Sequence, residues 1–533
     1  MDWLQSYRSI RSIFFEKLSQ SAEKYKTWTG ELYLEKHQGT LTSQGRNKKY
    51  NRLMEKSLRE LEFAASMALV YGGKEYPKDQ LDDIWKEVLL YQFHDILPGS
   101  SIKRVYDESL ERYEQLYEKV QALTKEYYVA LSKALHLEGT IVFNSLPWDR
   151  SEWLESSTGW KQITIPAMGY LAVDESAART LPQQALLRAE KDLLENDLLL
   201  IRFNENGTIA SIYDKENKRE TIASGEAANQ LTIYHDHGDA WDFPGDYRQM
   251  KSEAPKLVDV KCRVEGPYAT IVHQFTFGNS VIQQSVVLTL SSRRIDFQTK
   301  VDWKESRKML RSSFPFNVRA DQVTSEIQFG YLKRPTHRNT LWDFAKDEIC
   351  AHHWIDLSEP GYGAALLNDS KYGHRAQGNV LDINLLRSPQ YPDPEADQAE
   401  HEFVYSLYPH HGDFNKAEVY KRGYELNVPV YQLPESIANS EVQPKSQSLI
   451  ELSGDGVMIE SIKKAEDEHA LIIRLYEAAG SHSEASVKLA FATEEIYETN
   501  LLEKRLDSKS LHEEEPISFT PFEIKTIKYV FKH

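Results

Sequence analysis

The sequence is poor in cysteine and has no long apolar segment. Only Cys262 and Cys350 occur among 533 residues, which suggests neither a zinc site built from cysteines nor a disulfide framework. No window approaches the roughly 20 apolar residues of a membrane-spanning helix. The N-terminal stretch MDWLQSYRSIRSIFFEKLSQ carries scattered charges and no small-residue cleavage site, unlike a secretory signal. These absences together predict a cytoplasmic protein in a reducing compartment.

Basic residues are fewer than acidic residues. The chain has 64 Lys and Arg against 81 Asp and Glu, for a formal net charge of −17. Nucleic-acid backbones and anionic membrane surfaces would repel such a chain, so neither is expected as the main partner. The length exceeds what one hydrophobic core organises, so several domains are predicted.

Apolar residues recur every three or four positions in the first third of the chain. Three amphipathic helices are therefore predicted, over residues 47–70, 81–97 and 102–133, with Ser100 or Ser101 as the N-cap of the third. Short connections favour packing as a bundle. The apolar stripes comprise Tyr50, Leu53, Leu58, Leu61 and Ala65 in the first segment, Leu81, Ile84, Trp85, Val88 and Leu89 in the second, and Ile102, Val105, Tyr106, Tyr113, Leu116, Val120, Leu123, Tyr127 and Leu131 in the third.

From residue 139 onward the pattern alternates between apolar and polar residues, with frequent Pro, Gly and Asn. Ile295, Phe297 and Val301 alternate with polar residues, as a strand with one buried face requires. Roughly 390 residues of this kind exceed one β-sandwich, so two or three β domains are expected. The polar stretch PESIANSEVQPKSQS (434–448) is the best candidate for an internal linker. The predicted fold class is therefore multidomain α+β, with helices first.

One stretch, YQFHDILPGSS (91–101), raises a functional question. His94 and Asp95 stand side by side where Pro98 and Gly99 are expected to end the second helix. A histidine there is favoured by the negative end of the helix dipole. Neighbouring residues on a helix point about 100° apart, so the two side chains are not expected to pair. Spacing alone favours a structural role, because one histidine is not a metal site.

Seven stretches, taken in order, resemble the helical middle region and the β domains of the glycoside hydrolase family 38 α-mannosidases. The resemblance spans nearly the whole chain, and no single motif carries it alone. The stretches are GELYLEKHQGTLTSQGRNKKYNR (30–52), LLYQFHDILPGSS (89–101), VFNSLPWDRS (142–151), NGTIASIYDKE (206–216), GDAWDF (238–243), RPTHRNTLWDFAKDEICAHHWIDLSEPGYGAALLNDSKYG (334–373) and YSLYPHHGDF (405–414).

This resemblance implies a domain arrangement. Residues 1–29 would be the end of a catalytic α/β barrel and residues 30–135 a three-helix middle domain. Residues 136–433 would form large β-sandwiches of the galactose-mutarotase-like, or supersandwich, type. After the linker, residues 449–533 would form a C-terminal β domain.

The resemblance also implies an activity, namely retaining hydrolysis of terminal α-mannosides with one catalytic zinc ion. His94 would be a zinc ligand and Asp95 would contact a sugar hydroxyl. Both roles suit the chemistry, since neutral imidazole is a good zinc ligand and a carboxylate accepts hydrogen bonds from a polyol.

Two further stretches are candidates for substrate binding. In YHDHGDAWDFPGDY (234–247), Trp241 offers an apolar face to a pyranose while Asp239 or Asp242 accepts hydroxyl protons. In the family this loop reaches the mouth of the active site. His37, in EKHQGT, falls near the outer subsites, where secretory-pathway relatives carry a bulky aromatic residue. The resemblance thus favours short oligosaccharides or mannosylglycerate-like substrates.

One departure from the family pattern limits the expected activity. The family's nucleophile, acid/base carboxyl and remaining zinc ligands belong to an N-terminal barrel, whereas this chain starts about 30 residues before the middle-domain signature. A retaining glycosidase needs two carboxyl groups about 5 Å apart, and Asp95 has no identifiable partner. We therefore expect a C-terminal portion without catalytic residues of its own, inactive alone. Its partner would be the barrel, in cis or as a separate subunit, and apolar surface left uncovered would favour self-association.

Two alternatives stay open. A metal-dependent phosphohydrolase also uses a His-Asp doublet, but it needs further ligands on nearby helices, and the predicted helices 47–70 and 102–133 contain no histidine. The other alternative is a non-catalytic β-rich module that binds carbohydrate or only supports a partner. Zinc separates the α-mannosidase interpretation from the binding module, since a catalytic remnant with only His94 should hold the ion poorly alone and tightly once the barrel is joined, whereas a binding module should ignore it in both states.

Overall fold

The computed structural model divides into two compact units, residues 1–35 and residues 36–533. The first unit contains the helix α1 (Asp2–Ser19) and the short 3₁₀ helix η1 (Ala22–Lys24). The structure describes residues 2–156, 159–173, 179–180, 186–436, 446–506 and 510–531. In that part of the chain no helix is long and apolar enough to cross a membrane.

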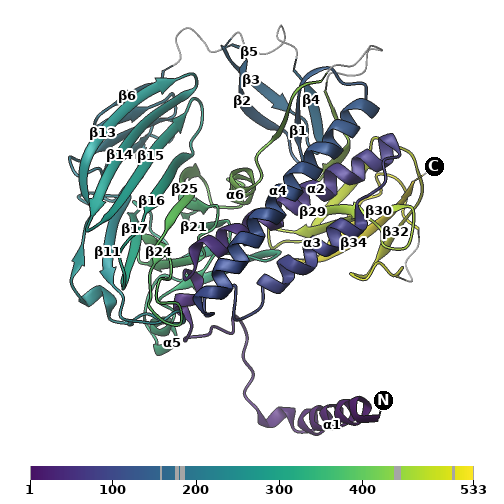
Figure 1. Cartoon of the computed structure of the whole chain (residues 1–533), viewed down its shortest axis with the longest axis horizontal. Coiled ribbons are helices and arrows are strands. Elements are labelled where there is room, and N and C mark those ends of the chain that lie inside the picture. The colour runs from purple at the N-terminus through teal and green to yellow at the C-terminus, as the bar shows by residue number, and fades with distance from the viewer. Residues whose placement is uncertain are drawn as a thin grey trace. The chain divides into compact units, whose positions relative to one another are not determined.

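The second unit begins with the 3₁₀ helix η2 (Gln38–Leu41) and three long helices, α2 (Gly45–Gly72), α3 (Lys78–Tyr91) and α4 (Lys103–Ala134). Figure 1 shows α2 and α4 side by side, as their contacts also require. The predicted stripes are largely buried, because each helix turns its apolar face to its neighbours. Leu89 and Ile102 are exceptions, exposed at 58% and 57%.

The predicted ends of two helices are wrong. The helix α3 stops at Tyr91 rather than at residue 97, and tight turns follow, in which the N–H of Ile96 bonds the carbonyl of Phe93. The N-cap of α4 is Ile102, without a side-chain capping bond, rather than a serine. The stretch between these helices is thus irregular backbone.

The remainder of the second unit is β-structure in which every strand pairing among the described residues is antiparallel. The largest sheets have nine and six strands. The nine-stranded sheet has the order β13 (Lys256–Glu265), β14 (Tyr268–Phe277), β15 (Ser280–Thr289), β16 (Ile295–Asp302), β25 (Glu400–His411), β22 (Tyr362–Asn368), β21 (Trp354–Glu359), β18 (Gln322–Ile327) and β19 (Gly330–Pro335). The six-stranded sheet has the order β12 (Ser252–Glu253), β11 (Gln230–His235), β17 (Lys308–Pro315), β24 (Val380–Arg387), β23 (Gly373–Gln377) and β20 (Ile349–Cys350).

Smaller sheets complete the β-structure. Before residue 221 there are a five-stranded sheet, β10 (Arg219–Glu220), β9 (Ile209–Asp214), β8 (Leu199–Phe203), β7 (Leu193–Glu195) and β6 (Arg188–Glu190), and a three-stranded one, β2 (Arg150–Ser156), β3 (Gly159–Ile165) and β5 (Arg179–Thr180). A four-stranded sheet joins distant segments, β26 (Tyr431–Ser436), β1 (Gly139–Asn144), β4 (Gly169–Ala172) and β27 (Ser446–Ser448). The C-terminal sheets are β28 (Ile450–Ser453), β31 (Ser483–Leu489) and β33 (Ile517–Phe519), and β29 (Val457–Lys464), β30 (Ala470–Glu477), β34 (Ile524–Phe531) and β32 (Thr493–Thr499). Short helices α5 (Leu341–Ala345), η3 (Tyr247–Gln249) and α6 (Val419–Asn427) lie between strands.

The nine- and six-stranded sheets pack face to face through aromatic side chains. Phe297 of β16 and Tyr405 of β25, both in the nine-stranded sheet, lie 5.9 and 6.3 Å, between ring centroids, from Phe314 of β17 in the six-stranded sheet. The alternation predicted for β16 is confirmed, with its apolar side chains buried and Gln298 and Lys300 exposed. This sandwich after a helical segment confirms the predicted α+β fold class.

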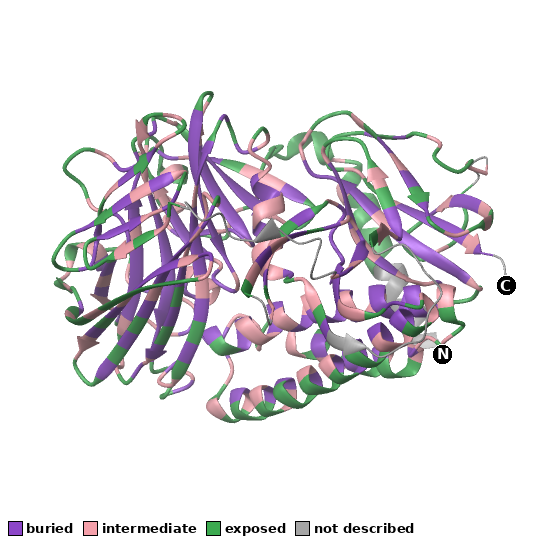
Figure 2. Cartoon of the chain, turned by 90° about the horizontal axis from the view of Figure 1, so that it is seen from above, coloured by how far each residue is buried: buried purple, intermediate pink, exposed green. Residues whose placement is uncertain are grey.

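The helices share an apolar core with the C-terminal sheets. Leu58 and Leu61 of α2 belong to the same buried cluster as Ile459 of β29 and Ile473 of β30, and Figure 2 shows buried residues on the helices as well as on the strands. The predicted linker, 434–448, includes residues 437–445, which lie outside the described residues; the described residues beside them belong to β26 and β27.

Candidate functional site

Two of the predicted substrate-binding stretches lie against each other. The main-chain N–H of Gln38 donates to Oδ1 of Asp242 at 3.0 Å, and the N–H of Gly39 donates to the carbonyl of Trp241 at 2.7 Å. Gly39 permits this close approach, because a Cβ there would meet Nη1 of Arg387 at 1.9 Å. His37 precedes this contact and is exposed, with a left-handed φ of +73° that turns the chain into η2. The fold thus brings His37, Trp241 and Asp242 to one region.

The loop carrying Trp241 is held by its own side chains and by one arginine. Oδ1 of Asp239 accepts hydrogen bonds from the N–H groups of Trp241 and Asp242, both at 3.0 Å, which closes a tight turn. Arg387, fully buried at the end of β24, donates to Asp236 at 2.8 Å and to the carbonyl of Asp242 at 3.2 Å. One carboxylate oxygen of Asp239 is therefore engaged in hydrogen bonds within the loop itself.

An exposed aromatic rim borders this loop. Trp241 is half-buried with its ring 6.2 Å from that of Tyr391, which is 65% exposed. The side-chain amide of Gln38 donates to the carbonyl of Ala345 at 3.1 Å and so fixes α5 beside the loop. The helix α5 exposes Trp342 at 67%, together with Leu341 and Phe344.

His94 and Asp95 lie on the surface and contact each other, contrary to the prediction from helical spacing. Nε2 of His94 is 3.7 Å from Oδ2 of Asp95, and their side chains are 78% and 59% exposed. The prediction fails because α3 has already ended, and in the following turns adjacent side chains are not held 100° apart. The hydroxyls of Ser100 and Ser101 donate to the carbonyl of Asp95, at 3.3 and 2.7 Å, instead of capping α4.

The His94 segment joins the other two stretches through Ser43 and Lys48. Nζ of Lys48 donates to the carbonyls of Ser43 and Leu97, the latter at 2.8 Å. Oγ of Ser43 donates to the carbonyl of Ala240 at 2.8 Å. Gly99, with φ of +95°, packs so closely on Ser43 that a Cβ there would lie 2.6 Å from that of Ser43. Three segments that are distant in sequence, 37–48, 94–99 and 236–242, therefore meet.

A buried polar cluster supports this junction, and sequence reasoning missed it. The carboxylate of Asp397 accepts from the main-chain N–H groups of Gln44 and Gly45, both at 2.7 Å, at the start of α2. Burial lowers the pKa of Lys48 to about 7, against the opposing effect of Asp397, and burial raises the pKa of Asp397 to about 6. Neither Asp397 nor Arg387 stands in a recognisable motif, so only the fold reveals their part.

The described residues do not by themselves form a metal site. Among them, no three His, Cys, Asp or Glu side chains are grouped so that they could hold a metal ion. His94 offers one exposed imidazole, with Asp95 beside it. A zinc ion bound here would need further ligands from outside the described residues.

Three family models match the chain in the order expected from its motifs. The alpha mannosidase middle domain matches residues 35–131, the glycosyl hydrolases family 38 C-terminal domain matches 194–395, and the family 38 C-terminal beta sandwich domain matches 456–527. The junction described above involves the first two of these regions.

Curated relatives and solved structures agree with the models. Alpha-mannosidase 2C1 of Homo sapiens is 36% identical over 97% of this chain and 52% of its own length, and an alpha-mannosidase of Saccharomyces cerevisiae is 32% identical over 97% and 50%. The chain thus spans about half the length of the curated relatives it matches. A putative mannosylglycerate hydrolase of Halalkalibacterium halodurans is 21% identical over 46% of the chain and 28% of its own length.

The fold is shared with a solved relative. The crystal structure of an alpha-mannosidase from Enterococcus faecalis matches with a TM-score of 0.78 at 15% identity, covering 93% of this chain and 68% of that one. The chain belongs to glycoside hydrolase family 38, whose middle domain and C-terminal domains it contains.

Proposed function

We propose that this chain is the part of a retaining, zinc-dependent α-mannosidase that completes the sugar site opposite a catalytic barrel. The supporting observation is the junction of segments 37–48, 94–99 and 236–242, which joins the segments that carry the predicted substrate-binding residues to the segment that carries an exposed His-Asp pair. The curated relatives, about twice as long, are α-mannosidases. The substrates would be short mannosides or mannosylglycerate-like compounds, and the low cysteine content suits a cytoplasmic enzyme.

The residues of this chain would bind and orient the mannose ring. Asp95 and Asp242 would accept hydrogen bonds from sugar hydroxyls, Asp239 would do so through its second oxygen, and Trp241 would cover the CH face. His37 would face the aglycone. When bound, the zinc ion would hold sugar hydroxyls, with His94 as one ligand. The described residues contain no group of three possible metal ligands, so we assign the other ligands and both catalytic carboxyl groups to the barrel.

The barrel would cover the exposed aromatic rim of Trp342, Phe344 and Tyr391. Apolar side chains gathered on a surface are typical of an interface. The barrel would be joined in cis or as a separate subunit, and where it is missing the rim would favour self-association of this chain.

The test compares the 533-residue chain alone with the same chain joined to a family 38 barrel, using p-nitrophenyl α-mannoside. We expect no release of p-nitrophenol by the chain alone and zinc-dependent release by the joined enzyme. His94→Ala in the joined enzyme should lower both bound zinc and kcat, while Lys86→Ala, on the exposed side of α3, should change neither. Robust zinc-dependent release of p-nitrophenol by the chain alone would refute the assignment of the catalytic carboxyl groups to the barrel. Equal zinc content with and without His94→Ala would refute the ligand role and favour a non-catalytic module.

A further inference from the structure

We propose that a cavity separate from the candidate mannose site, between the helices and the C-terminal sheet, binds a neutral saccharide of one or two rings. The cavity has a volume of about 840 Å³, within the usual range for small-molecule sites. None of its lining residues belongs to the segments 37–48, 94–99 or 236–242. The proposal therefore goes beyond the α-mannosidase function and does not rest on it.

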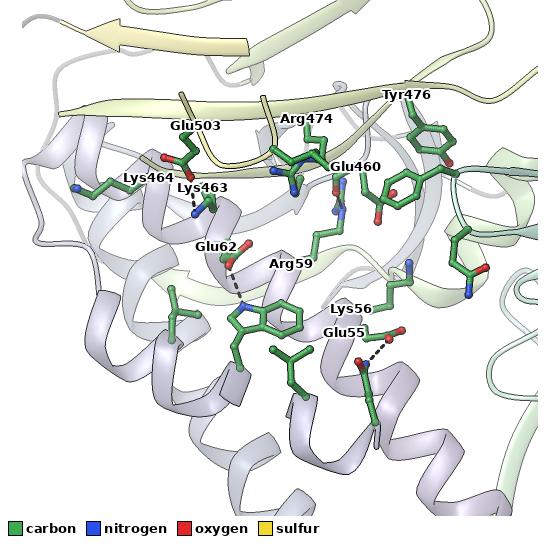
Figure 3. A pocket seen from close by; sticks show the side chains of 18 of the residues that line it. Glu55, Lys56, Arg59, Glu62, Glu460, Lys463, Lys464, Arg474, Tyr476 and Glu503 are labelled. Carbon is green, nitrogen blue, oxygen red and sulfur yellow. Dashed lines mark hydrogen bonds and ion pairs between the residues drawn. The ribbon is translucent and has the colours of Figure 1, made fainter. Parts of the chain in front are cut away.

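The cavity is lined by side chains from distant parts of the chain. Figure 3 shows Lys56 and Arg59 extending from the helix toward the strands that carry Glu460, Arg474 and Tyr476. Residues of α2 and α3 form one wall, and residues of β29, β30 and the end of β18 form the other. A ligand held between these walls would contact both the helical segment and the sheet.

Ion pairs at one side of the cavity are already satisfied. Lys78 pairs with Asp82 at 3.0 Å and with Glu466 at 2.7 Å, and Lys463 pairs with Glu466 at 2.6 Å and with Glu503 at 2.9 Å. These groups join α3 to the C-terminal strands. Because these charged groups already pair with one another, they offer few free hydrogen-bonding positions to a ligand. The other lining groups would therefore bind the ligand.

Two cationic groups in the lining retain hydrogen-bond donors. Nζ of Lys56 lies 4.6 Å from the ring centre of Tyr424 and has no hydrogen-bond or ion-pair partner among the described residues. Arg474 donates only through Nε, to Thr526 at 3.3 Å, which leaves the two terminal nitrogens without a partner in the described part of the chain. Both side chains are half-buried, and unused donors of this kind are normally satisfied by water or by a ligand.

Acceptors line the same cavity as these donors. Glu62 uses one carboxylate oxygen for the indole N–H of Trp85, at 3.0 Å, and Glu460 uses one for the hydroxyl of Tyr424, at 2.6 Å. The second oxygen of each has no hydrogen-bond partner among the described residues. Hydroxyl groups both donate and accept, so a polyol can satisfy a wall on which donors and acceptors are mixed.

His353 adds a buried, neutral ring to the lining of the same cavity. It is 7% exposed, its Nδ1 lies 2.7 Å from Oε2 of Glu326, and its Nε2 has no partner in the described part of the chain. Burial lowers the pKa of His353, so the ring is neutral. Nε2 is itself closed to solvent, so His353 contributes a neutral ring to the cavity wall rather than a hydrogen-bonding group in contact with a ligand.

The mixture of charges favours an uncharged ligand over an ionic one. Lys56 and Arg474 would repel a cation, while Glu62, Glu326 and Glu460 would repel an anion. Burial raises the pKa of Glu62 and of Glu326 to about 7 and lowers the pKa of Lys56, which weakens the attraction of the lining for ions of either sign near neutral pH. The aromatic lining residues, Tyr76, Trp85 and Phe329, supply faces for the CH groups of a sugar ring.

The test is isothermal titration of the 533-residue chain with mannose, glucose, mannobiose and maltose, beside inorganic phosphate and spermidine. We expect saturable binding of at least one of the saccharides and weaker binding of both ions. Lys56→Met and Arg474→Met should each weaken saccharide binding about tenfold, because a hydrogen bond from a charged donor is lost. Two variants are used so that, if one fails to fold, the other still tests the proposal.

Matched controls locate the binding. Lys86→Met makes the same substitution at a side chain that is 74% exposed and does not line the cavity, and Asp242→Asn alters the α-mannosidase region. Lys86→Met should leave the affinity for every saccharide unchanged, and Asp242→Asn should leave the affinity for glucose and maltose, which are not α-mannosides, unchanged. The proposal is overturned if no saccharide gives a saturable isotherm, if phosphate or spermidine binds more tightly, or if Asp242→Asn abolishes binding while both cavity variants retain it.

Discussion

Oδ1 of Asp242 accepts a hydrogen bond of 3.0 Å from the main-chain N–H of Gln38, which joins residues 204 positions apart. This contact fixes the loop of a β-sandwich to the chain that enters the helical segment. Since Asp242 and its neighbour Trp241 are candidates for sugar binding, the same bond that stabilises the fold also sets the shape of the candidate site.

Two substitutions at Asp242 should distinguish the stabilising effect of its hydrogen bond from the effect of its negative charge. Asp242→Ala should lower the free energy of unfolding by about 1–2 kcal/mol, because the N–H of Gln38 loses its partner. Asp242→Asn should cost less than half as much, since an amide oxygen can still accept. Urea unfolding followed by circular dichroism measures both. Equal losses for the two variants would contradict the role of this hydrogen bond.

Replacing Arg387 should strongly destabilise the fold. Arg387→Leu leaves the buried carboxylate of Asp236 without a counter-charge, and we expect a loss of about 3–5 kcal/mol in the free energy of unfolding. Adding Asp236→Asn should recover about 1–2 kcal/mol, because the uncompensated charge disappears. The measurement is a double-mutant cycle in urea. A double variant that is less stable than Arg387→Leu alone would argue against charge compensation as the cause.

Buried histidines should make the chain sensitive to acid. Burial lowers the pKa of His352 and of His401 to about 3 and that of His374 to about 4. Below pH 6.5 the unfolded chain takes up protons that the folded chain cannot, so stability falls as pH drops from about 6.5 toward 3 or 4.

One substitution tests this slope. His401→Gln should reduce the dependence of the unfolding free energy on pH, between pH 6 and 4, by about 1.4 kcal/mol per pH unit. His411→Gln, at the exposed end of the same strand β25, is the matched control and should leave the slope unchanged. An unchanged slope for His401→Gln would mean that this ring is protonated in the folded state.

The exposed His94 and Asp95 should contribute little to stability. His94→Ala and Asp95→Ala remove a solvent-exposed contact of 3.7 Å, and each should change the free energy of unfolding by less than about 0.5 kcal/mol. Thermal unfolding of the two variants measures this. Losses well above 1 kcal/mol for His94→Ala would support the structural role that helix spacing first suggested.

The local sequence pattern was sufficient to predict which side chains are buried where one face of a helix or strand packs against the core. The alternation in β16 and the stripes of α2 and α4 predicted their buried faces, because a strand repeats every two residues and a helix every 3.6. The order of seven motifs predicted the family. The same reasoning failed between residues 92 and 102, where the chain forms local turns and packs against Ser43 and Lys48 instead of continuing the helical period.

The sequence by itself determined the class of fold, the buried faces of its long elements, the family and the identity of the candidate sugar-binding residues. Only the tertiary structure decided that His37 and Asp242 lie together, that Arg387 and Asp397 support them, and that Lys56 and Glu460 share a cavity. The physical reason is that burial and hydrogen-bond partners across 200 or more residues follow from how sheets and helices pack, which no local period encodes.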